Sequence, residues 1–345
     1  MINLQSDLMN MPTDEMWDAM RHAKLGWVID REDPSVNHLE ETAANLLGKE
    51  AAIFVLTGRM ACLIALMTCC ERGNQIILEK DSHIAWSQEW GLSYVCGLYP
   101  RLIEGRDGIM NPRDVETVIT ESRFKHTQKT DLVCLENTHN MAGGTVLSVE
   151  QTKALCDVAH RHKAKVFIDG CRIFYAAAAL DLSPSELVGP ADMVAISLIK
   201  GLCGPGGALL CGTAEDIERA DLNLKRIGAA SFHRAGILAA AGLVGLEKMS
   251  GRLKEDIQRA KRFAKALNEI DGVGVNLNAV QSNIVMADIS ASGLLAIDFL
   301  KEMERRGVRA HQYTPEIVRF TFHRHITDND EEKVIEVVKT LMQGK

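Results

Sequence analysis

The chain has 345 residues, of which 46% are hydrophobic and 25% charged, and its formal net charge is −7 at pH 7. This length and composition are typical of a globular protein with one large and one smaller domain. The negative charge argues against nucleic acid as a partner, because nucleic-acid binding needs clustered Lys and Arg. The sequence has no run of 18 apolar residues and no basic segment followed by an apolar one at its start. We therefore expect no membrane span, no signal peptide and a cytoplasmic location.

Two helices are predicted before the first strand. One begins after Thr13, and the other begins after Ser35 and ends before Gly48. Ser and Thr favour the N-terminal cap of a helix, and glycine favours the position after its last turn. We expect this segment, residues 1–47, to pack across domains or subunits.

Apolar runs of strand length alternate with helical segments between residues 48 and 250. The predicted strands are residues 51–56, 75–79, 131–137, 164–169, 192–198 and 207–212, and the clearest helices are residues 58–70 and 148–163, the latter with Ser148 as its N-cap. This alternation predicts an α/β fold with a mainly parallel sheet and helices on both faces. Such sheets bind ligands at the carboxyl ends of their strands.

The pattern changes at about residue 251. A long polar helix is followed by strand-like runs within residues 283–290 and 317–322 and by helices near residues 291–306 and 328–343. We expect a smaller α+β domain over residues 251–345.

Neither the cysteines nor the histidines form a metal-binding pattern. The nine cysteines occur singly or as the adjacent pair Cys69 and Cys70, without a C-x-x-C motif. The histidine pairs His160/His162 and His323/His325 lack a carboxylate or thiol at ligand spacing. We predict reduced, mostly buried thiols and no catalytic metal.

Lys200 ends the apolar run of "SLIKGLCGPGG" and precedes a glycine-rich turn. Burial disfavours the charged form of lysine, and a neutral amine is a nucleophile that forms Schiff bases with carbonyl compounds, including pyridoxal phosphate. The alternative is a surface lysine at the end of a strand.

Asp169 ends the apolar run of "KVFIDGCR", with Arg172 three residues later. A buried, unpaired carboxylate is costly. One suitable partner is the protonated ring nitrogen of pyridoxal phosphate. The alternative is an ion pair between Asp169 and Arg172.

A third strand end, "FVLTGRMA", passes directly into a helix. The free amides of Gly58, Arg59 and Met60 would face the edge of the sheet, where a helix N-terminus attracts phosphate. Turns of this kind are also common in α/β proteins without phosphate. The combination is more specific, however: Lys200, Asp169 and this turn match the aldehyde, the ring nitrogen and the phosphate of pyridoxal phosphate, respectively.

The sequence resembles the threonine aldolases of the fold-type I pyridoxal phosphate enzymes, which are grouped with the β-eliminating lyases. The resemblance covers nearly the whole chain and depends on motifs in the family's order: "NLQSD", "EDPSVNHLEETAANLLGKEAAIFV", "LENTHNMAGGTVL", "FIDGCRIFYAA", "SLIKGLCGPGGALLCG" and "AGILAAAGL". It implies a pyridoxal phosphate-dependent aldolase that cleaves the Cα–Cβ bond of a β-hydroxy-α-amino acid to glycine and an aldehyde.

The resemblance also implies roles for individual residues. Lys200 would form the Schiff base, Asp169 would hold the ring nitrogen, and Thr57, Gly58 and Arg59 would hold the phosphate. His83 would stack on the cofactor ring, and His126 would approach the β-hydroxyl of the substrate, so that Lys200, His83 and His126 are the catalytic candidates. Ser6, Arg172 and Arg319 would bind the substrate carboxylate, as guanidinium groups suit carboxylates.

Three departures from the family pattern concern the site. "GWVIDRED" replaces an acidic segment followed by Val-Tyr-Gly, Arg59 replaces a small hydroxyl residue, and "AASFHRAG" replaces a glycine-rich run. In the family, an arginine after that run reaches the phosphate of a neighbouring subunit, and here the position is His233. Our hypothesis is that Arg59 supplies this charge within its own subunit, with Arg234 as another candidate. The resemblance implies a homodimer or homotetramer with its sites between subunits.

Other reactions remain open from the sequence. The same cofactor supports β-elimination, racemisation and transamination, and fold alone does not fix function. A nicotinamide-binding protein is disfavoured because no G-x-G-x-x-G follows a strand. Trp27, Trp86 and Trp90 lie near the site motifs, which fits either a bulky aldehyde portion or packing in the core or an interface.

Overall fold

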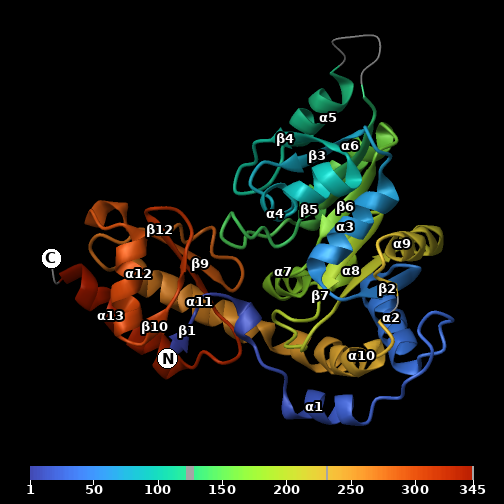
Figure 1. The fold of residues 1–345 in the computed structure, drawn as a ribbon. Helices are drawn as coiled ribbons and strands as arrows, with labels where there is room; N and C mark the ends of the chain where they lie inside the picture. Colours follow the sequence, from blue (N-terminus) through green and yellow to red (C-terminus); the bar gives the residue numbers. More distant parts are fainter. Residues whose placement is uncertain (122–127, 231, 344–345) are drawn as a thin grey trace.

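A seven-stranded sheet forms the centre of the larger part of the chain, and the C-terminal part lies beside it (Figure 1). The computed structural model describes residues 1–121, 128–230 and 232–343, and within them the strand order is β2-β8-β7-β6-β5-β3-β4. The strands are β2 (Ala51–Val55), β3 (Gln75–Glu79), β4 (Tyr99–Ile103), β5 (Thr130–Glu136), β6 (Lys165–Asp169), β7 (Met193–Ser197) and β8 (Ala208–Gly212). β8 is antiparallel to both neighbours, and the other pairs are parallel. The predicted mainly parallel sheet is confirmed.

The two faces of the sheet bury separate apolar cores, because side chains alternate along each strand. Along β6, Val166 and Ile168 belong to one core and Phe167 to the other. The first core includes residues of α2 (Pro34–Leu47), α5 (Pro112–Thr120), α6 (Val149–Arg161), α7 (Ile173–Leu180), α8 (Pro184–Val188) and α10 (Ala235–Val244). The second includes residues of α3 (Gly58–Cys69), α4 (His83–Ser87), α9 (Ala214–Arg226) and the π-helix Gly91–Cys96. Helices therefore cover both faces, as predicted.

Side-chain caps fix the starts of several helices. Thr57 caps α3, and Ser148 caps α6 through a reciprocal pair of hydrogen bonds with Gln151. The cap of α2 is Asp33, which accepts hydrogen bonds from the amides of Ser35 and Val36. The predicted cap at Ser35 is wrong by two residues, because the carboxylate ahead of Pro34 satisfies the free amides of the first turn.

The C-terminal part has its own sheet and core. β9 (Ile284–Asp288), β11 (His311–Gln312) and β12 (Ile317–Thr321) form an antiparallel sheet in the order β11-β12-β9. The helices are α11 (Leu253–Asn268), α12 (Ala296–Arg305) and α13 (Asp328–Gln343). The predicted helix over residues 291–306 starts later, because the short 3-10 helix Ser290–Ser292 ends at Gly293, whose φ is 73°.

The N-terminal residues join this C-terminal part. β1 (Ile2–Asn3) pairs in parallel with β10 (Val308–Arg309), and Ile2 and Leu4 are buried in the C-terminal core. After the 3-10 helix Asp7–Met9, the chain crosses to α1 (Asp14–Arg21), which packs against α10 (Figure 1). The π-helix Gly245–Met249 and the 3-10 helix Ser250–Arg252 connect α10 to α11.

Several general features complete the fold. All nine cysteines are free, three of them half-buried and the others buried. Among the described residues, no group of three or more His, Cys, Asp or Glu is arranged to hold a metal ion. None of the helices in the described ranges combines the length and apolar character needed to cross a membrane.

Candidate active site

A pocket lies at the carboxyl ends of β5, β6 and β7. It is lined by His83, Glu136, Thr138, Asn140, Asp169, Cys171, Arg172 and Lys200. Glu136 and Asp169 end their strands side by side in register, and Lys200 follows the end of β7 by three residues. Four of the residues predicted for the site, His83, Asp169, Arg172 and Lys200, therefore meet in one place.

Asp169 is a buried carboxylate of this pocket, with 3% of its surface exposed. One oxygen accepts a hydrogen bond from the amide of Cys171 at 3.2 Å, and the other lies 3.6 Å from Nδ1 of His83. Burial raises the pKa of Asp169, but the His83 ring and the charge of Lys200 outweigh burial and hold this pKa below its usual range. The alternative ion pair between Asp169 and Arg172 is not formed, since Arg172 pairs with Asp7.

Lys200 lies half-buried in the turn after β7. Its carbonyl oxygen accepts a hydrogen bond from the side-chain amide of Asn10 at 3.0 Å, which ties the turn to the N-terminal segment. A Cβ at Gly201 would lie 2.7 Å from the ring of Tyr175 and from Leu253, so only glycine allows the turn to pack this closely. The chain thus holds the Lys200 backbone firmly beside Asp169.

The start of α3 adjoins the same pocket. A Cβ at Gly58 would lie 2.8 Å from Sγ of Cys171, which lines the pocket. The prediction of three free amides is wrong for Met60, because the Thr57 hydroxyl accepts its hydrogen bond at 3.1 Å. The amides of Gly58 and Arg59 have no acceptor in the described part of the chain. The Arg59 side chain is exposed.

Two arginines meet at one acceptor on the other side of the pocket. Nη1 of Arg172 and Nη1 of Arg319 each donate to Oδ1 of Asn140 at 3.2 Å. Arg319 also donates from Nη2 to the carbonyl oxygen of Gln5 at 3.2 Å, and its buried Nε has no partner among the described residues. Burial and the charge of Arg172 lower the pKa of Arg319 to about 10.

Asp7 balances one of these two cations. Its buried carboxylate accepts hydrogen bonds from Nε and Nη2 of Arg172, each at 2.8 Å. The Ser6 hydroxyl lies 3.5 Å from Asp7 and accepts a hydrogen bond from the amide of Leu8. Two guanidinium groups against one carboxylate leave an excess positive charge, which suits a ligand with one carboxylate.

Other predicted site residues lie elsewhere. His126 is outside the described residues. His233 stacks on Trp27, with ring centroids 4.7 Å apart, and Arg234 is exposed; neither lines the pocket. Trp86 and Trp90 are exposed, which excludes packing in the core of the single chain and leaves an interface or a bulky aldehyde portion as their predicted role.

The sequence analysis missed Asp7, Glu136 and Asn140. All three lie within motifs that carry the resemblance, "NLQSD" and "LENTHN". Their roles depend on contacts with Arg172, His83 and Arg319, which only the fold brings close.

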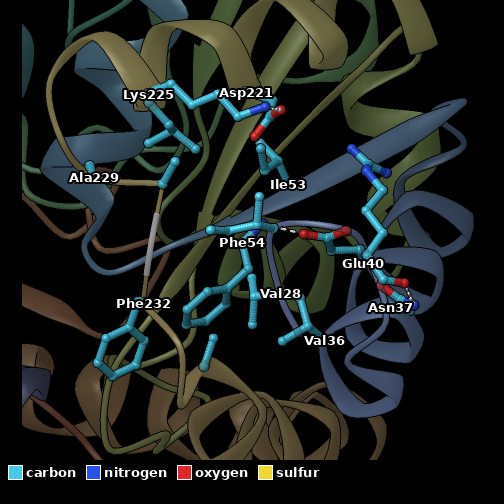
Figure 2. Close-up of a pocket in the computed structure, with 15 residues that line it drawn as sticks. Val28, Val36, Asn37, Glu40, Ile53, Phe54, Asp221, Lys225, Ala229 and Phe232 are labelled. Atoms are coloured by element: carbon cyan, nitrogen blue, oxygen red, sulfur yellow. Dashed lines mark hydrogen bonds and ion pairs between the residues drawn. The ribbon is translucent and has the colours of Figure 1, made fainter. Parts of the chain in front are cut away.

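A second pocket lies beside the edge strand β2 (Figure 2). Val28, Val36 and Phe54 contribute apolar surface, and Glu40 accepts a hydrogen bond from the amide of Phe54 at 2.8 Å. Burial raises the pKa of Glu40 to about 7. None of the residues that line the first pocket also lines this one.

Comparison with known proteins gives consistent matches over nearly the whole chain. A family model described as "Beta-eliminating lyase" matches residues 3–290. Low-specificity L-threonine aldolase 1 of Arabidopsis thaliana is 36% identical over 333 residues, which cover 95% of this chain and 93% of that protein. Alanine racemase TOXG of Cochliobolus carbonum is 28% identical over 316 residues, covering 89% of this chain and 80% of that protein. The structure of threonine aldolase from Leishmania major superposes with a TM-score of 0.86 at 18% identity, covering 99% of this chain and 100% of that one.

Proposed function

Because the chain belongs to the beta-eliminating lyase family, we propose that it is a pyridoxal phosphate-dependent lyase that cleaves the Cα–Cβ bond of a threonine-like β-hydroxy-α-amino acid, releasing glycine and an aldehyde. The sequence-based predictions of this family and of the fold-type I architecture are confirmed, and the threonine aldolase relatives support the predicted aldolase chemistry and cofactor. The individual roles below are proposals.

The residues of the pocket fit the cofactor. An amine (Lys200), a buried carboxylate (Asp169) and an aromatic ring (His83) line one pocket, and a helix start with free amides adjoins it at Gly58. The close approach of Gly58 to Cys171 leaves no room for a larger residue at this helix start. These groups match the aldehyde, ring nitrogen, ring face and phosphate of pyridoxal phosphate, and Thr57, Arg59, His233 and Arg234 stay candidates for the phosphate.

Each residue has a distinct task. Lys200 would hold the cofactor covalently through Nζ, and Asp169 would keep the proton on its ring nitrogen. When bound, the cofactor withdraws electrons from the Cα atom of the amino acid. Arg172 and Arg319, with Ser6 beside them, would bind the carboxylate and so fix which bond at Cα is weakened. His83 or His126 would take the proton from the β-hydroxyl.

One observation carries the proposal more than any other. The lysine and the buried aspartate lie in the same pocket as Arg172, which shares the acceptor Asn140 with Arg319. A pocket that combines an amine, a countercharge for a cationic ring and the Arg172 guanidinium, with that of Arg319 bound to the same Asn140, is suited to an α-amino acid.

Racemisation is the second candidate, supported by the likeness to alanine racemase TOXG. The test is to incubate the holoenzyme with L-threonine, L-allo-threonine, phenylserine, serine and L-alanine. Glycine, aldehyde, keto acid and D-alanine are then measured together. We expect glycine and aldehyde in equal amounts from the β-hydroxy substrates. Keto acid and ammonia without glycine would indicate β-elimination, and D-alanine alone would indicate the racemase.

We also infer a homodimer or homotetramer in the cytoplasm. Trp90 and Tyr94 are 79% and 88% exposed, and exposed aromatic side chains are typical of surfaces that partners bury. In this assembly residues 1–47 would pack across domains or subunits, residues 48–250 would bind the cofactor and residues 251–345 would form the smaller domain. Sedimentation of the holo-protein tests the assembly, and a monomer would contradict it.

A further inference from the structure

Glu136 connects the two halves of the site. It ends β5, lines the pocket and is 7% exposed. Its Oε2 accepts a hydrogen bond from the backbone amide of His83 at 2.6 Å, and its Oε1 accepts one from the backbone amide of Asn140 at 2.8 Å. Each carboxyl oxygen therefore accepts a hydrogen bond from a different backbone amide.

The first contact fixes the start of α4. Ser82 occupies the N-cap position of this helix but makes no capping hydrogen bond, and its buried hydroxyl has no partner in the described residues. The amide of His83 is instead satisfied by Glu136, which comes from a different strand. The position of the His83 ring in the pocket therefore depends on Glu136.

The second contact fixes the loop that holds the arginines. Asn140 receives Nη1 of both Arg172 and Arg319 on its side-chain oxygen, while its backbone amide is held by Glu136. A shift of the Asn140 backbone would move the common acceptor of both guanidinium groups. One side chain thus sets the spacing between His83 and the carboxylate-binding arginines.

We propose that Glu136 is a positioning residue that holds His83 against the cofactor and, through Asn140, aligns Arg172 and Arg319 for the substrate carboxylate. The assignment of one side to the cofactor and the other to the substrate carboxylate rests on the proposed function, whereas the contacts of Glu136 do not. A second buried carboxylate nearby, Glu79, accepts hydrogen bonds from Asp81, Gly105 and His139 and does not line the pocket. It cannot replace Glu136.

The test compares Glu136→Gln and Glu136→Asp with the control Asp131→Asn. Asp131 lies at the opposite end of β5, is also buried, and accepts hydrogen bonds from the amide of Glu71 and the side chain of Asn74. Glutamine keeps the shape but offers one acceptor, and aspartate keeps the charge but is too short to reach both amides. For each variant, the cofactor Kd of the apo-protein, KM, kcat and Tm are measured.

We expect both Glu136 variants to weaken cofactor binding and raise KM by about tenfold each, the size of one lost charge-assisted hydrogen bond. Asp131→Asn should change Tm alone. Full function of Glu136→Asp would show that only the charge matters, and a fall in kcat with unchanged KM and cofactor Kd would show direct action on the substrate. Either result overturns the proposal.

Asn140→Ala separates the effect on the arginines from the effect on His83. It also provides the test if the Glu136 variants do not fold. It keeps the backbone contact with Glu136 and removes the shared acceptor, so KM should rise while the cofactor Kd stays constant. A loss of cofactor affinity in Asn140→Ala as large as that in the Glu136 variants would contradict the assignment of Asn140 to the carboxylate side. Because the cofactor titration needs no turnover, it gives an answer even if the wild-type protein releases no glycine, which would refute only the proposed function.

Discussion

Asp7 and Arg172 form a buried, bidentate ion pair with two hydrogen bonds of 2.8 Å, although 165 residues separate them in the sequence. The pair fixes the N-terminal segment to the turn after β6. Replacing Asp7 by Asn leaves the Arg172 charge uncompensated, so we expect Asp7→Asn to lower the free energy of unfolding by about 3–5 kcal/mol. Urea unfolding measures this, with the exposed pair partner Asp18→Asn as a control near zero.

The same pair predicts a dependence on pH. Burial raises the pKa of Asp7, but Arg172 outweighs burial and holds this pKa below its usual range. The stabilisation by Asp7 is therefore complete above the unfolded-state pKa of about 3.9 and is lost as pH falls through the lower folded-state value. The stability difference between wild type and Asp7→Asn should shrink below about pH 4. A constant difference down to acid pH would contradict the role of this ion pair.

Arg319→Gln tests the carboxylate side. Burial and the charge of Arg172 lower the pKa of Arg319 to about 10, and an incoming carboxylate would relieve this repulsion. We expect KM to rise roughly 10- to 100-fold, as for a lost charge-assisted hydrogen bond, with little change in Tm. Arg309→Gln is the control, because Arg309 lies in β10 of the separate β1-β10 sheet and pairs with Glu304. An unchanged KM would remove Arg319 from the site.

Gly58→Ala tests the helix start at the pocket. The new Cβ would lie 2.8 Å from Sγ of Cys171, so α3 or Cys171 would have to move. Overpacking of this kind costs about 1–3 kcal/mol, and we expect cofactor affinity of the apo-protein to fall about tenfold. The double variant Gly58→Ala/Cys171→Ala should recover most of it, because the clashing sulfur is gone. If the double variant binds as weakly as Gly58→Ala, the clash is not the cause.

Glu40→Gln tests the half-buried carboxyl beside β2 (Figure 2). Burial raises the pKa of Glu40 to about 7. The folded state therefore holds a proton that the unfolded state releases between about pH 4.3 and 7, and wild-type stability falls over this range. We expect Glu40→Gln to be more stable than wild type by about 2–3 kcal/mol at pH 8 and similar at pH 4. The exposed neighbour Glu41→Gln should show no such trend, and a parallel pH profile for both variants would contradict the assignment.

The strands that carry the site could be predicted because each is an unbroken apolar run ending in a polar or glycine residue. Asp169 and Lys200 were recognisable because each ends or closely follows such a run. Strand β4 was missed. Its Tyr99, Pro100 and Leu102 are exposed at the edge of the sheet. The sequence of this strand therefore shows neither a continuous apolar run nor an alternation of apolar and polar residues.

The supporting residues could not be found in the same way. Asp7, Glu136 and Asn140 act by holding other residues, and their partners lie on distant segments. Nothing local distinguishes Asp7 from a surface aspartate until the fold brings Arg172 to it. The cap at Asp33 was missed for a similar reason, since Ser35 is an equally good cap by type and only the backbone geometry decides.

The central claim is that Lys200 holds the cofactor. The most direct test is to reduce the holo-protein with borohydride, digest it and locate the pyridoxyl group by mass spectrometry, with Lys200→Ala treated in parallel. The account predicts a single modified peptide containing Lys200 and no modified peptide from the variant. A modification at another lysine, or none in protein that retains the cofactor, would contradict it.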